Sequence, residues 1–476
     1  MDDTSQRIDV AYLVSHGFAA RMVTQTNLLG ELVQAGLKVA LITPDARDIN
    51  LKIYCERAEV SLYEFSPANS LWTPRYAKSR MYFLENINRN PALLEKYKYA
   101  VHVRPAKRWI GRIRPRLLKV IHDAKERFPI IRSCYLKREH QLLASSKAAQ
   151  LIASIAPRIL VATYPVDFSE GMLLKAAASQ HRQTLIQLLS WDNISCKGHF
   201  PQLADDFLVW GEIMAEELRE YYGVEEKKIH RVGVPHFDLH LQVREKPEPA
   251  SYLATLGLLP DQPYLFFGMS SPRFAPREIN IVEWLAQQVR GGLFGPDMQL
   301  VIRPHPQNVQ GSLADKSWLP RLEALNGNMV GVDFPDLSAG KMPWSMQQQD
   351  MERMSHLLAG SSLCLNSGST LSIDALMCRT PVILTSFDGK EELPYWESAR
   401  RLVDYSHLQK LVCLRGVEVA KNYEELTNSI KVLLSNPNYH QNFRNKTIQL
   451  QCANAIGNSA TTATVDWLRK RVNRLE

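Results

Sequence analysis

Short, uninterrupted runs of apolar residues recur along this chain, and a polar turn and a helical segment follow most of them. Such a run is typical of a strand that is buried on both faces, and strands of that kind form parallel sheets. Strands, some of them given with the polar turn that follows, are expected at 8–14, 37–44, 157–165, 184–191, 205–211, 228–238, 263–271, 299–307, 328–334, 363–365 and 382–384. The alternation of strands and helices predicts an α/β fold with parallel sheets.

The order of these segments predicts two doubly wound, Rossmann-like domains that face a cleft. A chain of 476 residues is long enough for two or three domains, each with its own core. We expect a first domain at 1–240, a proline-containing linker at 241–262, a second domain at 263–455, and a C-terminal helix at 456–476 that packs back on the first domain.

The sequence also predicts one helix and two short strands whose bounds are less obvious. The spacing of apolar residues predicts one helix over about 20–35, and Gly36 ends it in the way that is common for helix-terminating glycines. Late in the chain, 401–404 and 411–414 are expected to form short strands.

A basic segment lies in the first domain, within a helical insertion expected at about 70–150. Between Lys98 and Arg138 there are thirteen Lys or Arg residues and two acidic residues, an excess of +11 against a net charge of +8 for the whole chain. Apolar residues alternate with these charges at helical spacing: Trp109, Ile110, Ile113, Leu117, Leu118, Val120 and Ile121. Such a segment, 98–138, suits an anionic membrane surface or an acidic acceptor.

Two other interpretations of this segment remain open. A solvated helical insertion would pack its apolar stripe on its own domain, as surface helices commonly do. Nucleic acid is disfavoured as a partner, because no nucleic-acid-binding module is recognisable elsewhere in the chain.

Composition favours a cytoplasmic protein. The hydrophobic content of 45% and charged content of 22% are those of a water-soluble globular chain, and no run approaches the length of about 18 apolar residues that a membrane span needs. The seven cysteines are scattered and form no CxxC pair, which favours a reducing compartment. The acidic N-terminus runs directly into a strand, unlike a signal peptide. Peripheral binding to the inner face of the cell membrane is compatible with the basic segment.

The stretch Leu363–Leu384 contains the clearest candidate for a ligand site. Its residues Asn366–Thr370 form a small turn, rich in hydroxyls and containing Gly368, between a strand and a helix. Free N–H groups at a helix start favour an anion, and a diphosphate fits such a turn. An ordinary capped turn has a similar composition, because Ser and Thr are also the usual helix caps.

Other polar turns follow predicted strands. Ligands of doubly wound sheets bind beyond the carboxyl ends of the strands, so these turns together predict one cleft between the two domains. Besides Asn366–Thr370 they are His16-Gly17, Trp191-Asp192-Asn193, Ser270-Ser271 and Arg303-Pro304-His305-Pro306.

Five motifs together carry a resemblance to a known family: SWDNISCKG (190–198), DDFLVWGEIMAEEL (205–218), IHRVGVPHFD (229–238), VIRPHP (301–306) and NSGSTLSIDALMCRTPVI (366–383). With these motifs in this order, the chain resembles bacterial glycosyltransferases of the GT-B fold, and is most similar to surface-polysaccharide transferases and the CDP-glycerol glycerophosphotransferase-like group. The resemblance covers about 150–440. It implies transfer of a sugar from a nucleotide-activated donor to a surface glycan or glycolipid acceptor.

The resemblance also implies a nucleotide-sugar donor site in the second domain, where the donors of the turns would stabilise a leaving diphosphate. Arg303 has a structural alternative, because neighbouring residues of a strand point to opposite faces. Asp374 stands where retaining members often have a Glu; its alternative is a solvated helical carboxylate. The candidate donor-binding residues are Ser270, Arg303, His305, Asn366, Ser367, Gly368, Ser369, Thr370 and Asp374.

The first domain would then be the acceptor side and supply the general base. His16 stands after the first strand, where inverting GT-B members with a histidine base place theirs, and Asp192 is its rival at another strand end. Trp191, Asn193 and Lys197 are candidate contacts to the acceptor or sugar. For each of these residues the alternative is a structural role in the turn, in the core or at the surface.

Metal-independent chemistry without a cofactor is expected, because Asp205-Asp206 only precede a buried strand and no convincing DxD motif is present. Three alternatives remain open: a CDP-glycerol or Kdo-type transferase, a UDP-GlcNAc 2-epimerase-like isomerase, and a non-catalytic GT-B binding subunit. The isomerase is weakened by Ser15-His16-Gly17-Phe18, which stand where an arginine-rich turn is expected for that group.

Overall fold

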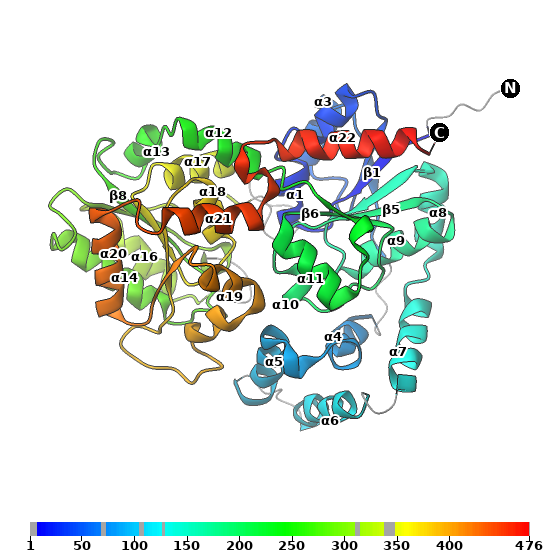
Figure 1. Cartoon of the computed structure of the whole chain (residues 1–476), viewed down its shortest axis with the longest axis horizontal. Coiled ribbons are helices and arrows are strands. Elements are labelled where there is room, and N and C mark those ends of the chain that lie inside the picture. Colours follow the sequence, from blue (N-terminus) through cyan, green and yellow to red (C-terminus); the bar gives the residue numbers. More distant parts are fainter. Residues whose placement is uncertain are drawn as a thin grey trace. The chain divides into compact units, whose positions relative to one another are not determined.

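The computed structural model of the chain describes residues 7–67, 73–103, 109–125, 129–309, 315–337 and 348–475 (Figure 1). These residues form two compact units. The first unit contains the described residues up to His236 and from Gln451 onward, and the second contains those from Phe237 to Leu450. Each unit is built on one parallel sheet, which confirms the α/β fold class expected from the apolar runs.

The sheet of the first unit has seven strands in the order β3-β2-β1-β4-β5-β6-β7, and all neighbours pair in parallel. Val10 pairs with Val39 on one side and Ile159 on the other, so the strand order reverses between β1 and β4. This is the switch point of a doubly wound sheet. The strands are β1 (Val10–Leu13), β2 (Val39–Thr43), β3 (Ser61–Glu64), β4 (Ile159–Ala162), β5 (Gln183–Gln187), β6 (Asp206–Val209) and β7 (Ile229–Arg231).

A helix from the far end of the sequence belongs to this unit. Helix α22 (Ala460–Asn473) contacts α2, and Gln187 Nε2 of β5 donates to Thr464 Oγ1 at 3.2 Å. The other helices outside the insertion are α1 (Gly17–Val23), α2 (Leu28–Gln34), α3 (Ile49–Arg57), α8 (Ser146–Ile155), α9 (Phe168–Ser179), α10 (Asn193–Cys196) and α11 (Glu212–Tyr222).

The expected helical insertion lies between β3 and β4. Its core is small: Tyr82, Ile87 and Leu93 are buried together, and Leu118 packs against them. The insertion therefore has an apolar cluster of its own. Its α-helices are α4 (Thr73–Leu84), α5 (Pro91–Lys98), α6 (Trp109–Lys125) and α7 (Pro129–Leu142).

The second unit repeats the architecture with six parallel strands in the order β10-β9-β8-β11-β12-β13, so its switch point lies between β8 and β11. The strands are β8 (Tyr264–Gly268), β9 (Gln299–Arg303), β10 (Val330–Val332), β11 (Leu363–Asn366), β12 (Val382–Thr385) and β13 (Glu418–Ala420). The helices are α12 (Phe237–Glu245), α13 (Ala250–Thr255), α14 (Glu278–Arg290), α15 (Pro306–Val309), α16 (Trp318–Leu325), α17 (Gln348–Ala359), α18 (Leu371–Met377), α19 (Ser406–Cys413), α20 (Tyr423–Ser435) and α21 (Gln441–Gln451).

The single helix expected over 20–35 is wrong, because the chain is divided at Thr26 into α1 and α2. Thr26 Oγ1 donates to Met22 O at 2.8 Å and accepts from Leu28 N at 3.3 Å. Its hydroxyl thus takes up one backbone group at the end of α1 and another at the start of α2, which is how Thr competes with a continuous helix.

The strands expected at 401–404 and 411–414 are also wrong, since both stretches are helical. The first lies in a 3-10 helix, Ala399–Asp404, capped by Ser398 Oγ, which accepts from Arg400 N at 3.0 Å. The second overlaps α19. Within α19, Leu408 and Leu411 are buried three residues apart, at helical rather than alternating spacing, and short apolar runs do not separate these two cases.

The stretch expected as a linker, 241–262, is largely structured. It contains the end of α12, helix α13 and the approach to β8, all within the second unit. His240 of α12 is fully buried, so this element is part of the unit's packing.

Replacing Gly268 by Ala is predicted to destabilise the second unit. Gly268 ends β8, and an added Cβ would overlap Leu371 Cδ2 at the start of α18. Overpacking of this kind costs about 1–3 kcal/mol. We expect Gly268→Ala to lower the thermal unfolding midpoint of the wild-type protein. In a Leu371→Ala background, where the overlapping methyl group is absent, the same substitution should lower the midpoint by less. Equal losses in the two backgrounds would contradict the contact.

Candidate functional site

The carboxyl edge of the second sheet contains a chain of buried polar contacts. Glu278, in the first turn of α14 and 1% exposed, accepts from Ser270 N and from Ser367 Oγ, each at 2.6 Å. Ser367 Oγ also lies 2.9 Å from Thr385 Oγ1, at the end of β12. One carboxylate therefore joins the turns that follow β8 and β11, on the two sides of the switch point.

The turn after β9 is joined to the same place. Asn308 Oδ1 accepts from His305 N, and Asn308 Nδ2 donates to Ser270 O at 2.9 Å. Three adjacent turns, after β9, β8 and β11, are thus tied through the backbone of Ser270. The sequence-predicted residues Ser270, His305 and Ser367 belong to one network within the second unit.

The imidazole ring of His305 is neutral. Burial lowers its pKa to about 4, so the ring carries no charge at neutral pH. Its Nδ1 accepts from Gln307 N at 3.1 Å, which places the ring proton on Nε2. His305 can therefore give one N–H bond to an anionic oxygen, without contributing a positive charge.

Asn366 shapes the hydroxyl-rich turn from within. Its Oδ1 accepts from Gly368 N at 2.8 Å, Ser369 N at 3.1 Å and Ser372 Oγ at 3.1 Å. Two of the amides that were expected to face an anion are occupied by this side chain. The hydroxyls of Ser369 and Thr370, which are only partly buried, are the remaining candidates for ligand contact.

Gly368 has a structural reason of its own. Its φ of +101° is in the left-handed region, and an added Cβ would lie 2.8 Å from Leu408 Cδ1 of α19. The glycine therefore allows the turn to pack against α19. Packing against α19 is thus a structural role for Gly368, which the sequence placed among the candidate donor-binding residues.

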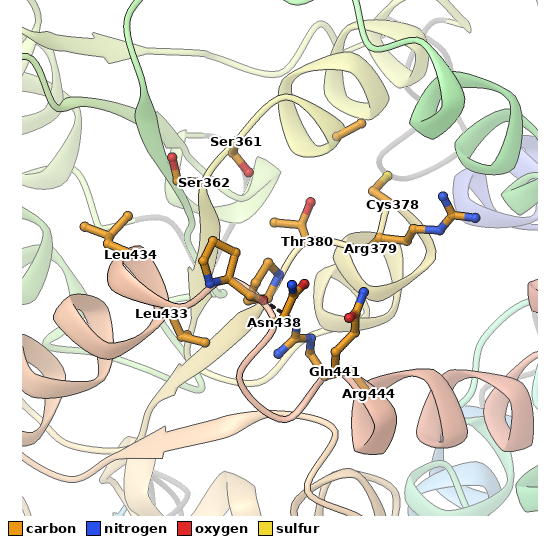
Figure 2. Close-up of a pocket in the computed structure, with 13 residues that line it drawn as sticks. Ser361, Ser362, Cys378, Arg379, Thr380, Leu433, Leu434, Asn438, Gln441 and Arg444 are labelled. Carbon is orange, nitrogen blue, oxygen red and sulfur yellow. Dashed lines mark hydrogen bonds between the residues drawn. The ribbon is translucent and has the colours of Figure 1, made fainter.

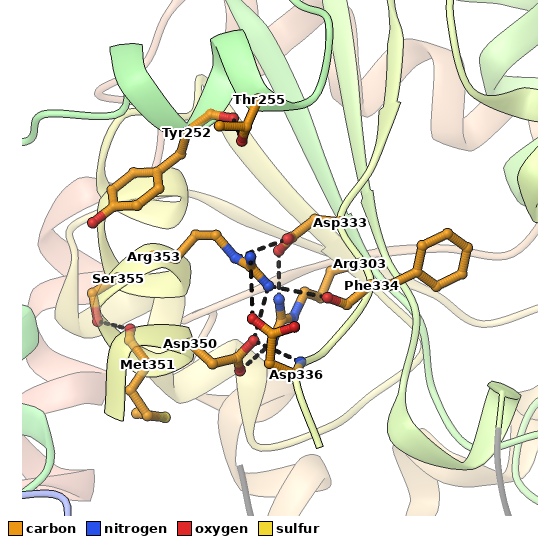
Figure 3. Close-up of polar contacts among 10 residues, drawn as sticks. All are labelled: Tyr252, Thr255, Arg303, Asp333, Phe334, Asp336, Asp350, Met351, Arg353 and Ser355. Carbon is orange, nitrogen blue, oxygen red and sulfur yellow. Dashed lines mark hydrogen bonds and ion pairs between the residues drawn. The ribbon is translucent and has the colours of Figure 1, made fainter. Parts of the chain in front are cut away.

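Arg303 is held in a buried ion-pair network (Figure 3). Its guanidinium contacts Asp333 at 2.5 Å and also Asp350, and its side chain is 7% exposed. Arg353 bridges the same two carboxylates at 2.9 and 3.0 Å. This geometry favours the structural alternative for Arg303, because it ties β9 and β10 to α17 and balances the charge of both acids.

Asp374 is likewise part of the packing. It is 2% exposed, and its Oδ1 lies 2.8 Å from His240 Nε2; His240 Nδ1 lies 2.7 Å from Ser355 Oγ. The three side chains join α12, α17 and α18. The alternative of a solvated helical carboxylate at Asp374 is wrong.

The first sheet has a matching carboxylate at its own switch point. Glu170 of α9 is 1% exposed and accepts from Ser15 Oγ at 2.5 Å, Thr163 N at 3.0 Å and Tyr164 N at 2.8 Å. It joins the turns after β1 and β4. The turn that contains His16 is therefore fixed from below by a buried acid, as the Ser270 turn is in the second unit.

His16 is a neutral ring beside Tyr164, with 5.1 Å between ring centroids. Burial and the charge of Lys197 lower its pKa to about 4, against an opposing effect of Asp167. The imidazole is therefore unprotonated at neutral pH, as a general base must be, and its lowered pKa makes it a weaker base than an ordinary histidine. His16 is thus close enough to Lys197 for the charge of the lysine to affect its pKa, and its ring lies beside that of Tyr164.

The motif 190–198 contains an ion pair, and most of its side chains are buried. Asp192 Oδ2 lies 3.1 Å from Lys197 Nζ, and Asp192 Oδ1 accepts from Ser190 Oγ at 2.7 Å. Asp192 raises the pKa of Lys197, which keeps the lysine charged. Trp191 is 3% exposed and Asn193 fully buried, which favours core roles for both.

Sequence reasoning missed Glu170, Glu278, Asn308 and Tyr164. Both glutamates stand in the first turn of a helix, where an acid is expected simply because it complements the helix dipole. The sequence did contain a signal. Glu170 and Glu278 each lie in the first turn of an apolar helix, FSEGMLLKAAAS or EINIVEWLAQQVR, and each helix is the first to follow a central strand.

A pocket of about 390 Å³ in the second unit lies elsewhere (Figure 2). Its lining includes Ser361 and Ser362 before β11, Arg379 and Thr380 before β12, and Arg444 of α21. These residues are at the amino ends of the strands, whereas ligands of such sheets bind at the carboxyl ends. The pocket is therefore separate from the candidate site.

Solved structures share this fold. The chain matches UDP-GlcNAc 2-epimerase from Neisseria meningitidis, bound to UDP-GlcNAc, with a TM-score of 0.55 and 12% identity over 97% of this chain and 100% of that one. A glycosyltransferase from Rickettsia africae gives 0.51 and 10%, covering 98% of each chain. A putative UDP-N-acetylglucosamine 2-epimerase from Listeria monocytogenes gives 0.53 and 12%, covering 98% and 97%.

The expected GT-B type of fold is confirmed by these matches, and identities this low show the fold alone. No protein-family model matches the chain, and no curated protein does. Nothing in the comparisons supports the CDP-glycerol group in particular.

The two buried glutamates predict that stability falls as pH rises towards 8. Burial raises the pKa of Glu170 from 4.5 to about 8 and that of Glu278 to about 7. Between pH 4.5 and the raised pKa of each glutamate, its carboxyl group is deprotonated in the unfolded chain and still protonated in the folded chain. The free energy of unfolding therefore decreases with pH, by up to about 1.4 kcal/mol per unit for each group.

We expect Glu170→Gln and Glu278→Gln each to reduce this slope, because the amide resembles the protonated carboxyl. The measurement is the unfolding midpoint across the range from about pH 5 to pH 8. Glu220→Gln, at an exposed position of α11, is the matched control. Slopes that are the same in all four proteins would refute the assignment.

Proposed function

We propose that this protein transfers a glycosyl group from a nucleotide-activated donor to a surface glycan or glycolipid acceptor, without a metal, at the cytoplasmic face of the membrane. The observation that carries the proposal is the tied carboxyl edge of the second sheet, which holds the hydroxyls of Ser369 and Thr370 and the Nε2–H of His305 on adjacent turns. Donors fixed in advance stabilise the charge of a leaving diphosphate.

In the proposed reaction, the acceptor oxygen forms a bond to the anomeric carbon while the bond from that carbon to the diphosphate breaks. The hydroxyl proton passes to a base, and the negative charge passes to the diphosphate. We assign the base to His16, because it is neutral, whereas Asp192 is ion-paired with Lys197. Lys197 suits an anionic group on the acceptor.

A second candidate is isomerisation of the nucleotide sugar itself. It is favoured by the two matching epimerase structures, one of which contains UDP-GlcNAc. The two functions differ in their requirement for an acceptor. Conversion of a nucleotide sugar to its epimer in the absence of any acceptor would select the isomerase.

One nucleotide is predicted to stabilise the protein in a thermal-shift screen of UDP, GDP, CDP, CMP and dTDP. A ligand at 100 times its Kd adds about 2.7 kcal/mol to the free energy of unfolding. Ser369→Ala, Thr370→Val and His305→Ala should each weaken binding about tenfold or more, because a hydrogen bond to a charged group contributes about 1.5–3 kcal/mol.

Ser362→Ala is the matched control, since Ser362 precedes the same strand β11 at its opposite end. It should leave nucleotide affinity unchanged. Unchanged affinity in the three site variants would disprove the site, and the absence of any nucleotide shift would favour the non-catalytic binding subunit.

The base assignment predicts different outcomes for two substitutions. His16→Gln should lower kcat by about 10²–10⁴-fold, the usual contribution of a general base. Asp192→Asn should retain most of kcat, because the proposed base, the imidazole of His16, stays in place. The substitution removes only the ion pair with Lys197. The measurement is initial rate at saturating donor for both variants. The reverse pattern would transfer the role to Asp192.

A further inference from the structure

Helix α6 exposes its apolar stripe to solvent. The stripe is formed by five large side chains whose exposed fractions are 70% for Trp109, 63% for Ile110, 49% for Ile113, 57% for Leu117 and 65% for Val120. With 3.6 residues per turn, these positions fall within an arc of about 100° on one side of the helix. A stripe of this size on the surface marks a site of interaction.

The opposite side of α6 attaches it to the insertion. Leu118 packs against the cluster of Tyr82, Ile87 and Leu93. His122 is 1% exposed, and its Nε2 accepts from Ile87 N at 3.1 Å. The helix is therefore packed by the side that carries Leu118 and His122. Of the apolar residues that the sequence pattern grouped together, Leu118 therefore packs on its own domain, whereas the five exposed residues do not.

Exposed arginines flank the stripe on both sides. Arg112 and Arg116 lie along one edge, and Arg114 lies along the other. The neighbouring α7 adds the exposed Ile130 and Arg132. Arg104, Lys107, Arg108 and Arg127 of the basic segment fall outside the described residues.

We propose that α6 binds in the plane of an anionic membrane, with its stripe among the acyl chains and its arginines at the lipid phosphates. The two features together favour a lipid surface over nucleic acid: phosphate attracts arginine in both, but a lipid surface also accepts the five aliphatic and indole side chains. No helix in the described part of the chain is long and apolar enough to span a bilayer. The proposal goes beyond the reaction proposed above and does not depend on it.

The test is co-sedimentation of the full chain with vesicles of phosphatidylcholine alone or mixed with phosphatidylglycerol. The wild-type protein should sediment with the anionic vesicles. Arg112→Glu/Arg116→Glu should reduce that partition by about 25-fold or more, because each basic side chain near the surface contributes about fivefold. Ile113→Glu/Leu117→Glu should abolish binding, and quenching of fluorescence by brominated anionic lipid should be weaker in Trp109→Phe.

Ile49→Glu/Ile53→Glu is the matched control, because α3 exposes these two isoleucines by 63% and 56% at the same spacing of four residues. It should bind vesicles as the wild type does. Equal recovery from both vesicle types, or an equal loss in the control, would overturn the proposal. So would a wild-type dimer that Ile113→Glu/Leu117→Glu makes monomeric, which would identify the stripe as an interface between copies. Nucleotide shifts, measured in parallel, should be the same in every variant, so failure here is distinguishable from failure of the donor site.

Discussion

A buried carboxylate at a switch point recurs in both sheets, and the candidate chemistry depends on it. A doubly wound sheet opens at that point, because the chain leaves in opposite directions from two neighbouring strands. The turns on either side therefore need an interaction that holds them together. Glu170 supplies it through Ser15 and the amides of Thr163 and Tyr164, and Glu278 through Ser270 and Ser367. His16 and the hydroxyl-rich turn owe their positions to these acids.

The strands and their order were largely predictable, because parallel strands buried on both faces must be continuously apolar. The errors occurred where local chemistry competes with periodicity. Thr26 interrupts an otherwise continuous helical pattern by bonding to Met22 O. At 399–413, short apolar runs fit a strand and a helix equally, and only the packing of Leu402 and Leu408 decides between them.

The candidate site was predictable as a set of turns but not as a set of roles. Arg303 and Asp374 have the residue types that bind phosphate and ribose, yet their partners, Asp333, Asp350 and His240, are distant in sequence and visible only after folding. Protonation states are likewise visible only after folding. His305 is neutral because burial lowers its pKa, and the sequence does not show that this side chain is buried.

The bonds that Asn366 makes within its own turn have a kinetic consequence. Because this side chain already holds Gly368 and Ser369, the turn is ordered by its own hydrogen bonds in the absence of a ligand. Little chain entropy remains to be lost on association, and no slow ordering step precedes it. Under the donor site proposed above, a nucleotide should therefore bind this turn at a rate set by diffusional encounter, and differences between competing nucleotides should be found in how fast each one leaves.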